Sequence, residues 1–147
     1  MPTIGVFAAI SDAQGRVLCV RHAYGAREWG MPGGRVEPGE DPITAVGREI
    51  AEETGVIAKI TDFVGVYAAP YRDDVVLLFR GHAEKQHAWS PTDEISEWGF
   101  YALTDLPAPM AANPKVRFDD VRSGLGGIFC TFVAPGIRAP DRSLSQR

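Results

Sequence analysis

Three glutamates at helical spacing are the residues of this chain that most directly suggest chemistry. Glu49, Glu52 and Glu53 occupy positions i, i+3 and i+4, so in a helix their Cβ atoms would lie about 5 to 6 Å apart on one edge. Carboxylates so close repel one another, and near a helix C-terminus they also oppose the helix dipole. A bound cation would offset both costs, although such glutamates also occur on ordinary solvated helix faces.

The surrounding residues favour a bound cation over a solvated helix face. Gly33 and Gly34 precede the helix, and Glu40 stands just before its start. Arg48 is placed to hold the carboxylates through charge-assisted hydrogen bonds. Oxygen ligands suit a hard divalent ion, and Mg²⁺ commonly shares its shell with substrate phosphates. We therefore expect Mg²⁺, with Mn²⁺ as the alternative, to bind here together with a phosphorylated substrate.

A helix over residues 41–54 must position these carboxylates. Its predicted apolar face comprises Ile43, Val46 and Ile50. Asp41 is a suitable N-cap, Pro42 suits the first helical position, and Gly55 is placed to end the helix. Gly47, in its middle, predicts a place where the helix packs tightly against another element.

Strand-like segments flank this helix. We predict a hairpin from residues 3–10 and 16–21, a second from 56–69 and 75–83, and a further strand over 94–103. A second helix is expected over residues 114–124. This order indicates an α/β fold in which helices cover a mixed sheet. We expect one domain over residues 1–134, followed by a flexible Pro-, Arg- and Ser-rich tail over 135–147.

Composition narrows the classes of function. The chain has 147 residues, 45% of them hydrophobic, and a net charge of −4. The negative charge argues against bulk nucleic-acid binding, which requires Lys and Arg to neutralise phosphates. A divalent ion would still allow an anionic substrate, because it can reverse the local sign of charge.

The same sequence predicts a cytoplasmic protein without a membrane segment. Its apolar runs fall far short of the roughly 20 residues that span a bilayer, and Asp12, Gln14 and Arg16 interrupt any N-terminal signal-peptide pattern. Cys19 and Cys130 sit in apolar, strand-like surroundings, so we interpret both as reduced core residues.

The motif around the glutamates resembles a known family. Gly34 is followed after five residues by Glu40, and after seven more by Arg-Glu-Ile-Ala-Glu-Glu-Thr-Gly-Val over residues 48–56. This is similar at every defining position to the box of the Nudix hydrolases, of the MutT-like kind. A chance match is on the order of 10⁻⁷ or less. The lead-in over residues 29–34 and the acidic-aromatic stretch over 94–107 extend the resemblance.

The resemblance implies a fold and a set of roles. The fold would be an α/β/α sandwich with a mixed β-sheet. Glu49, Glu52 and Glu53 would bind the metal with help from the Gly33 carbonyl, and Glu49 would be either a ligand or the base that activates water. Arg48 would orient these carboxylates, and Glu40 would support the metal shell from outside.

Other candidate site residues are less specific. A further acidic residue from a late loop often joins such sites, and we choose Glu94 over Asp93 and Glu97, although a solvated acid is equally possible. Arg21 and Arg27 are candidates for phosphate contact or for ordinary solvation. Trp29 is a candidate for stacking on a base or for capping the core.

The implied reaction is cleavage of a diphosphate linkage in a nucleoside diphosphate derivative, such as a nucleoside triphosphate, ADP-ribose or a dinucleoside polyphosphate. Pro70 resembles a proline of ADP-ribose-cleaving relatives, and Tyr67 or Tyr71 a tyrosine of dinucleoside polyphosphate hydrolases, so these clues do not choose. The chain length favours nucleoside triphosphates or a related diphosphate.

The alternative is a non-catalytic Nudix-fold module that binds nucleotides or regulates, but such modules usually have damaged boxes. Enzymes of the same fold that act on isoprenoid diphosphates or messenger RNA caps are further rivals. The sequence allows a monomer or a homodimer, with residues 128–133 as a core strand or an interface strand.

Overall fold

A computed structural model describes residues 1–140 of the chain. Its elements in chain order are β1 (Thr3–Ser11), β2 (Val17–His22), β3 (Trp29–Gly30), β4 (Gly33–Arg35), α1 (Pro42–Thr54), β5 (Val56–Ala69), the 3₁₀ helix η1 (Pro70–Arg72), β6 (Asp74–Gln86), β7 (Ile95–Tyr101), α2 (Ala112–Arg122), β8 (Ile128–Ala134) and β9 (Ile137–Arg138). The predicted helices and strands are thus present, with shifted ends. No helix within residues 1–140 is long and apolar enough to cross a membrane.

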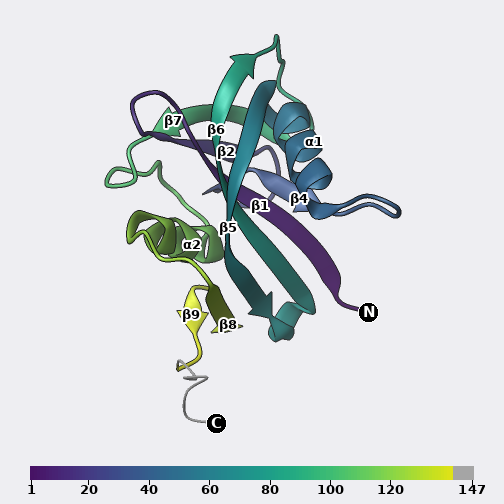
Figure 1. The fold of residues 1–147 in the computed structure, drawn as a ribbon, viewed down its shortest axis with the longest axis vertical. Helices are drawn as coiled ribbons and strands as arrows, with labels where there is room; N and C mark the ends of the chain where they lie inside the picture. The colour runs from purple at the N-terminus through teal and green to yellow at the C-terminus, as the bar shows by residue number, and fades with distance from the viewer. Residues whose placement is uncertain (141–147) are drawn as a thin grey trace.

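The strands form a mixed sheet in the order β3-β2-β1-β6-β5-β8-β9, with β4 added to β1 and β7 to β2. β1 runs parallel to β6, and β5 runs parallel to β8, whereas the other pairs are antiparallel. The two helices lie on either side of the strands (Figure 1). The expected α/β/α sandwich with a mixed sheet is therefore confirmed.

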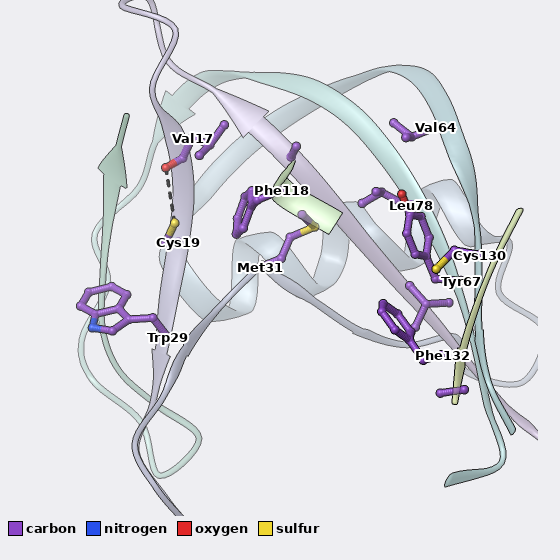
Figure 2. Close-up of a cluster of buried hydrophobic side chains, with 13 residues drawn as sticks. Val17, Cys19, Trp29, Met31, Val64, Tyr67, Leu78, Phe118, Cys130 and Phe132 are labelled. Atoms are coloured by element: carbon purple, nitrogen blue, oxygen red, sulfur yellow. Dashed lines mark hydrogen bonds between the residues drawn. The ribbon is translucent and has the colours of Figure 1, made fainter. Parts of the chain in front are cut away.

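Each face of the sheet has its own core, because alternate strand residues point to opposite faces. Under α1, the strand residues Val6, Ala8, Ile10 and Leu18 pack against Ala45, Val46 and Ile50. On the other face, Cys19, Tyr67, Leu78 and Phe132 surround Phe118 of α2 (Figure 2). Adjacent residues of β2, Leu18 and Cys19, thus belong to different cores, and both helices are fixed against one sheet.

Local sequence signals determine the ends of α1. The Asp41 carboxylate accepts a hydrogen bond from the Thr44 backbone N–H at 2.9 Å, which satisfies an amide that the helix itself leaves unpaired. At the other end Gly55 adopts a left-handed φ of 74°, and its N–H donates to Ala51 O at 2.8 Å. Both predicted caps are confirmed.

Two predictions about the faces of α1 are wrong. Ile43 is 55% exposed, because the buried face centres on Val46, Ile50 and Glu53 and leaves the first turn at its margin. A Cβ added at Gly47 would meet nothing within 4 Å, so this glycine does not mark a tight contact.

Three boundaries differ from expectation. β1 and β2 are paired only at Ser11 and Val17, since β1 bonds mainly to β4 and β6. α2 begins two residues early, at Ala112, because Pro114 fits within the first turn, where a helix needs no N–H donor. Ile137 and Arg138, inside the predicted tail, pair with β8. Residues 141–147 of that tail lie outside the described residues.

Candidate active site

A cleft of about 660 Å³ lies beside the central strands β1 and β6 and is lined by residues of both helices. Its lining includes Gly33, Gly34, Glu49, Glu53, Glu94 and Arg117. These residues come from β4, α1, the loop before β7, and α2. The cleft therefore joins carboxylates from two distant parts of the chain to a basic residue that the sequence did not single out. Its volume suits a ligand of nucleotide size.

The two glycines let the chain pass close to β1 and α1. A Cβ at Gly33 would overlap the Val6 carbonyl and lie 2.6 Å from the Phe7 ring. At Gly34 it would overlap the Glu49 carboxyl group. Gly33 is paired with Phe7 across the β1–β4 ladder. Glycine is needed because the backbone itself forms the wall that faces the carboxylates.

Glu53 is the most enclosed carboxylate of the cleft. Its side chain belongs to the buried face of α1, with 9% of the residue exposed. The Gly33 N–H donates to its Oε1 at 2.9 Å. Burial, reinforced by the charges of Glu49, Glu94 and Glu52, raises the pKa of Glu53 well above its usual value in spite of that hydrogen bond.

Glu49 is half-buried and Glu52 lies outside the cleft. Burial raises the pKa of Glu49, and Glu52 and Glu94 add to this effect, whereas Arg48 opposes it. The Glu52 carboxylate is 59% exposed and lies 3.3 Å from Arg48 Nη1. Of the three predicted metal ligands, the structure therefore brings Glu49 and Glu53 into the cleft and leaves Glu52 at its outer edge.

Arg48 holds the acidic helix to the loop before it. Its Nε and Nη2 donate to the two oxygens of Glu40 at 2.7 and 2.9 Å, a bidentate pair. Nη2 also donates to Arg35 O at 3.1 Å, and Nη1 donates to Glu49 at 3.0 Å. Glu40 raises the pKa of Arg48 and is the largest cause of that shift. The expected orienting role of Arg48 and supporting role of Glu40 agree with this geometry.

The carboxylates suit a hard divalent cation, but their side chains do not converge on a common position. Arg48 contacts Glu49 and Glu52 but not Glu53. Glu52 disfavours ionisation of Glu49, and both disfavour ionisation of Glu53. Within residues 1–140, no three Asp, Glu, His or Cys side chains are grouped closely enough to hold an ion. A site on these residues requires Glu52 to turn from Arg48 towards Glu49 and Glu53.

The loop that carries Glu94 is anchored to the end of α1. Trp89 Nε1 donates to Glu52 O at 3.1 Å, and Gln86 Nε2 donates to Thr54 O at 2.8 Å. These bonds satisfy carbonyls that the last helical turn leaves unpaired. Glu94 O then accepts from Ala23 N at 2.8 Å. Glu94 lines the cleft, whereas Asp93 and Glu97 are not among its lining residues.

Arg21, Arg27 and Trp29 do not line this cleft. Arg21 Nε donates to Arg27 O at 2.8 Å, and its guanidinium lies 6.0 Å from the Trp29 ring. Trp29 is 4% exposed and packs edge-on against Tyr101. We therefore do not retain these three as ligand-binding residues: two brace the loop between β2 and β3, and Trp29 caps the core.

The substrate clues from the sequence also have structural explanations. Tyr67 is 1% exposed and donates to Asp120 Oδ2 at 2.8 Å, so it cannot reach a ligand. Pro70 begins η1. Tyr71 accepts a hydrogen bond from Asn113 Nδ2 at 3.1 Å at the rim. None of the three decides between substrate classes.

Sequence reasoning missed Arg117 and the ring pair His22–Tyr24, all of which line the cleft. The two rings stack with centroids 5.1 Å apart. No signal marked Arg117, because α2 has too few apolar residues to show which of its faces is buried. Tyr24 and His22 lie in a loop with no residue pattern to fix its direction.

Comparison with known proteins now identifies the class. The NUDIX domain family model matches residues 1–120. A MutT-like protein of Streptomyces ambofaciens is 35% identical over 130 residues, covering 80% of this chain and 84% of the relative. A Bacillus subtilis (strain 168) protein, provisionally named 8-oxo-dGTP diphosphatase, is 31% identical over 147 residues, covering 100% and 98%.

Solved structures agree. The MutT NUDIX hydrolase of Burkholderia pseudomallei superposes with a TM-score of 0.72 at 29% identity, covering 82% of this chain and 98% of that one. The chain belongs to the Nudix family, and it is a Nudix hydrolase. The resemblance inferred from residues 34–56 is thereby confirmed.

Proposed function

We propose that this protein is a Mg²⁺-dependent hydrolase that cleaves a diphosphate linkage in a nucleoside triphosphate or a related nucleoside diphosphate derivative. The observation that supports this most is the pairing of two enclosed carboxylates, Glu49 and Glu53, with the glycine backbone of β4 in one cleft. Glu94 faces the same space from a separate loop. Mn²⁺ is the alternative ion.

Glu49, Glu52, Glu53 and the Gly33 carbonyl are the groups we propose to hold the ion. When bound, a divalent ion supplies neutralisation of phosphoryl charge and acidification of a water molecule. Arg48 keeps Glu49 turned towards the cleft through its 3.0 Å hydrogen bond. The Gly33 N–H does the same for Glu53, so the protein sets the carboxylate positions before substrate arrives.

The hydrolytic step needs a proton acceptor beside the attacking water. The water oxygen forms a bond to phosphorus, the bridging phosphorus–oxygen bond breaks, and the leaving oxygen keeps the electron pair. Glu49 and Glu94 are our candidates for the base, because both line the cleft. Burial raises the pKa of Glu49 above its usual value, which makes its carboxylate a stronger base. If Glu49 is a ligand, Glu94 takes this role.

The names of relatives do not choose the substrate. Besides the Bacillus subtilis protein, a Methanocaldococcus jannaschii relative named ADP-ribose pyrophosphatase is 50% identical over 100 residues, and an Escherichia coli relative named CTP pyrophosphohydrolase is 33% identical over 96. We propose the triphosphate class because the cleft is a single compact space of nucleotide size. Its products would be a nucleoside monophosphate and pyrophosphate.

The test is a substrate panel. Nucleoside triphosphates, ADP-ribose, dinucleoside polyphosphates and nucleotide sugars are incubated with and without Mg²⁺, and phosphate is measured after pyrophosphatase or phosphatase treatment. We expect Mg²⁺-dependent release from the triphosphates. Turnover that persists in excess EDTA would contradict the metal role, and turnover confined to another class would replace the proposed substrate.

Glu52→Gln tests the proposed ligand that lies outside the cleft. Loss of its charge should lower kcat by at least about 100-fold, because charge stabilisation is a major part of phosphoryl catalysis. The fold should remain intact, since this side chain is 59% exposed. Glu84→Gln, exposed on β6, is the control. Near-normal turnover of Glu52→Gln would remove Glu52 from the ligand set.

We also propose a cytoplasmic enzyme that exists as a monomer or a homodimer. Both cysteines are buried thiols, as expected for a reducing compartment. β8 has two faces: Cys130 and Phe132 belong to the core, whereas Phe129 and Val133 are 72% and 57% exposed. Sedimentation of the wild type and of Phe129→Ser would show whether that exposed face associates.

A further inference from the structure

Arg117 of α2 carries a buried guanidinium that has no ion-pair partner among residues 1–140. The residue is 5% exposed, and its Nε is sealed from solvent with no acceptor within residues 1–140. No carboxylate of the described residues lies within 4.0 Å of its guanidinium nitrogens, and its Cζ lies 4.9 Å from the centre of the Phe7 ring. Uncompensated buried charges are costly and therefore rare, so an acceptor from outside the chain is the natural explanation.

The fold directs this side chain into the cleft. The next residue, Phe118, is 0% exposed in the core beneath α2, which fixes the rotation of the helix. Arg117 lines the cleft, and the sealed Nε leaves the two terminal nitrogens as the atoms that a ligand can reach. The Phe7 ring also lies against Gly33, so this one ring separates Arg117 from the glycine backbone beside the glutamates.

The guanidinium stays charged at neutral pH. Burial lowers the pKa of Arg117 to about 10; the charge of Arg72 adds to this shift and that of Asp74 opposes it. Arg117 is therefore a donor only, with paired N–H groups in one plane. Its ligand must present two adjacent acceptors.

The surroundings favour an uncharged acceptor over a phosphate. Phe7, Val76 and Pro114 give the nearby wall an apolar character, so an entering dianion would lose its hydration at high cost. Asp74 and Arg72, of opposite charge, both line this region, so together they offer an entering anion little net attraction. The phosphates already have a site at the glutamates. What remains of a nucleotide is its base, a flat group with polar edges.

We propose that Arg117 is a specificity-determining residue that donates two hydrogen bonds to the O6 and N7 acceptors of a 6-oxopurine base. Arginine pairs with these two atoms in a bidentate manner. Adenine presents an amino donor beside N7, and pyrimidines lack the pair, so both would leave the guanidinium unsatisfied. This inference rests on the proposed nucleotide substrate and names its base.

Binding of nucleosides without phosphate or metal tests the inference independently of turnover. Guanosine, inosine, adenosine and 7-deazaguanosine are titrated against the ¹⁵N-labelled protein in EDTA, and the Arg117 Nε–H signal is followed. We expect guanosine and inosine to shift that signal and to bind roughly 10- to 100-fold more tightly than adenosine or 7-deazaguanosine, which lacks N7. Equal affinity for all four would overturn the proposal.

Two variants and a titration with inorganic phosphate are the controls. Arg117→Met should abolish the base preference, whereas Arg122→Lys, exposed on the same helix, should keep it. Inorganic phosphate should leave the Arg117 signal in place; a shift with phosphate alone would overturn the base contact in favour of an anion site. In turnover, the ratio of kcat/KM for GTP over ATP should fall towards 1 in Arg117→Met. Inactivity on every nucleotide combined with selective guanosine binding would contradict the proposed function and leave this inference supported.

Discussion

Two buried charges of opposite sign, Glu53 on α1 and Arg117 on α2, line the same cleft without being paired to each other. Glu53 has one amide donor from Gly33, and Arg117 has one aromatic ring. Each group lowers the stability of the ligand-free protein, because desolvation of an ion is repaid only by a well-placed partner. Binding of a cation and of a substrate base would therefore stabilise the folded protein.

For Glu53 this cost depends on pH. A carboxyl group whose pKa is raised on folding disfavours the folded state as pH rises above its ordinary value of 4.5. In EDTA, Glu53→Gln should therefore raise the thermal midpoint at pH 8 and have little effect at pH 4. Differential scanning fluorimetry of both proteins from pH 4 to pH 8 measures this. A midpoint lowered by the substitution at pH 8 would contradict it.

Mg²⁺ should reverse the order of the thermal midpoints of the wild type and Glu53→Gln at pH 8. A ligand present at 100 times its Kd stabilises the folded state by about 2.7 kcal/mol. The wild-type midpoint should rise with Mg²⁺ at pH 8, and that of Glu53→Gln should rise much less. Equal shifts in both proteins would place the ion elsewhere.

Arg117→Met should stabilise the ligand-free protein. A methionine fills similar volume without a charge, and comparable replacements of buried ions gain about 1–4 kcal/mol. Urea unfolding measures the difference, with Arg122→Lys as the control on the same helix. A large loss of stability would show that the guanidinium serves packing alone.

At the scale of elements, a buried polar network joins three parts of the second core. Tyr67 of β5 donates to Asp120 of α2 at 2.8 Å, and Arg138 of β9 donates to the same oxygen at 2.7 Å. Burial, with Asp120 as the next cause, raises the pKa of Tyr67 above its usual range. The phenol therefore stays protonated and keeps donating. This network fixes α2, and with it the position of Arg117.

Tyr67→Phe should lower stability by about 1–2 kcal/mol, because it removes a hydrogen bond to a charged acceptor while keeping the ring. Tyr71→Phe is the matched control, since Tyr71 is 45% exposed. Urea midpoints of both variants measure the difference. A Tyr67→Phe protein as stable as the control would mean that Arg138 alone satisfies Asp120.

The features that could be predicted from the sequence are those that depend on residues close together in the chain. The start and end of α1 were predictable, because Asp41 and Gly55 act on their own helix. The glutamates were predictable from spacing alone. Glu52 was expected beside Glu49 and Glu53, but its contact with Arg48 depends on side-chain rotation, which no spacing encodes.

Tertiary contacts decided the remainder. The sequence predicts a tail over residues 135–147 because this stretch is rich in Pro, Arg and Ser. The structure instead shows that Arg138 donates to Asp120 and that Ile137 pairs with β8. Trp29 was a candidate for base stacking because a lone aromatic residue in a loop shows no direction. Only the fold reveals that Tyr101 covers it.

At the scale of the whole molecule, the core beneath α2 is closed to solvent. Cys19 and Cys130 are 0% and 5% exposed, and burial raises the pKa of Cys19 to about 12. Iodoacetamide at pH 8 should modify neither thiol in the native protein and both in urea, because the thiolate is the reactive form and access is blocked. Mass spectrometry of intact protein counts the adducts. Rapid native labelling would show that the core beneath α2 opens on a short timescale.

The parallel pairing of β1 with β6 has a consequence for synthesis in the cell. Thr3 pairs with Asp74 and Ser11 with His82, so the first strand made must wait for a partner that leaves the ribosome some 71 residues later. During that interval the edge of β1 that pairs with β6 keeps its backbone hydrogen-bonding groups open on the nascent chain. Such long-range closure slows folding and exposes an aggregation-prone strand. The nascent chain should therefore be a target for ribosome-associated chaperones until β6 has emerged.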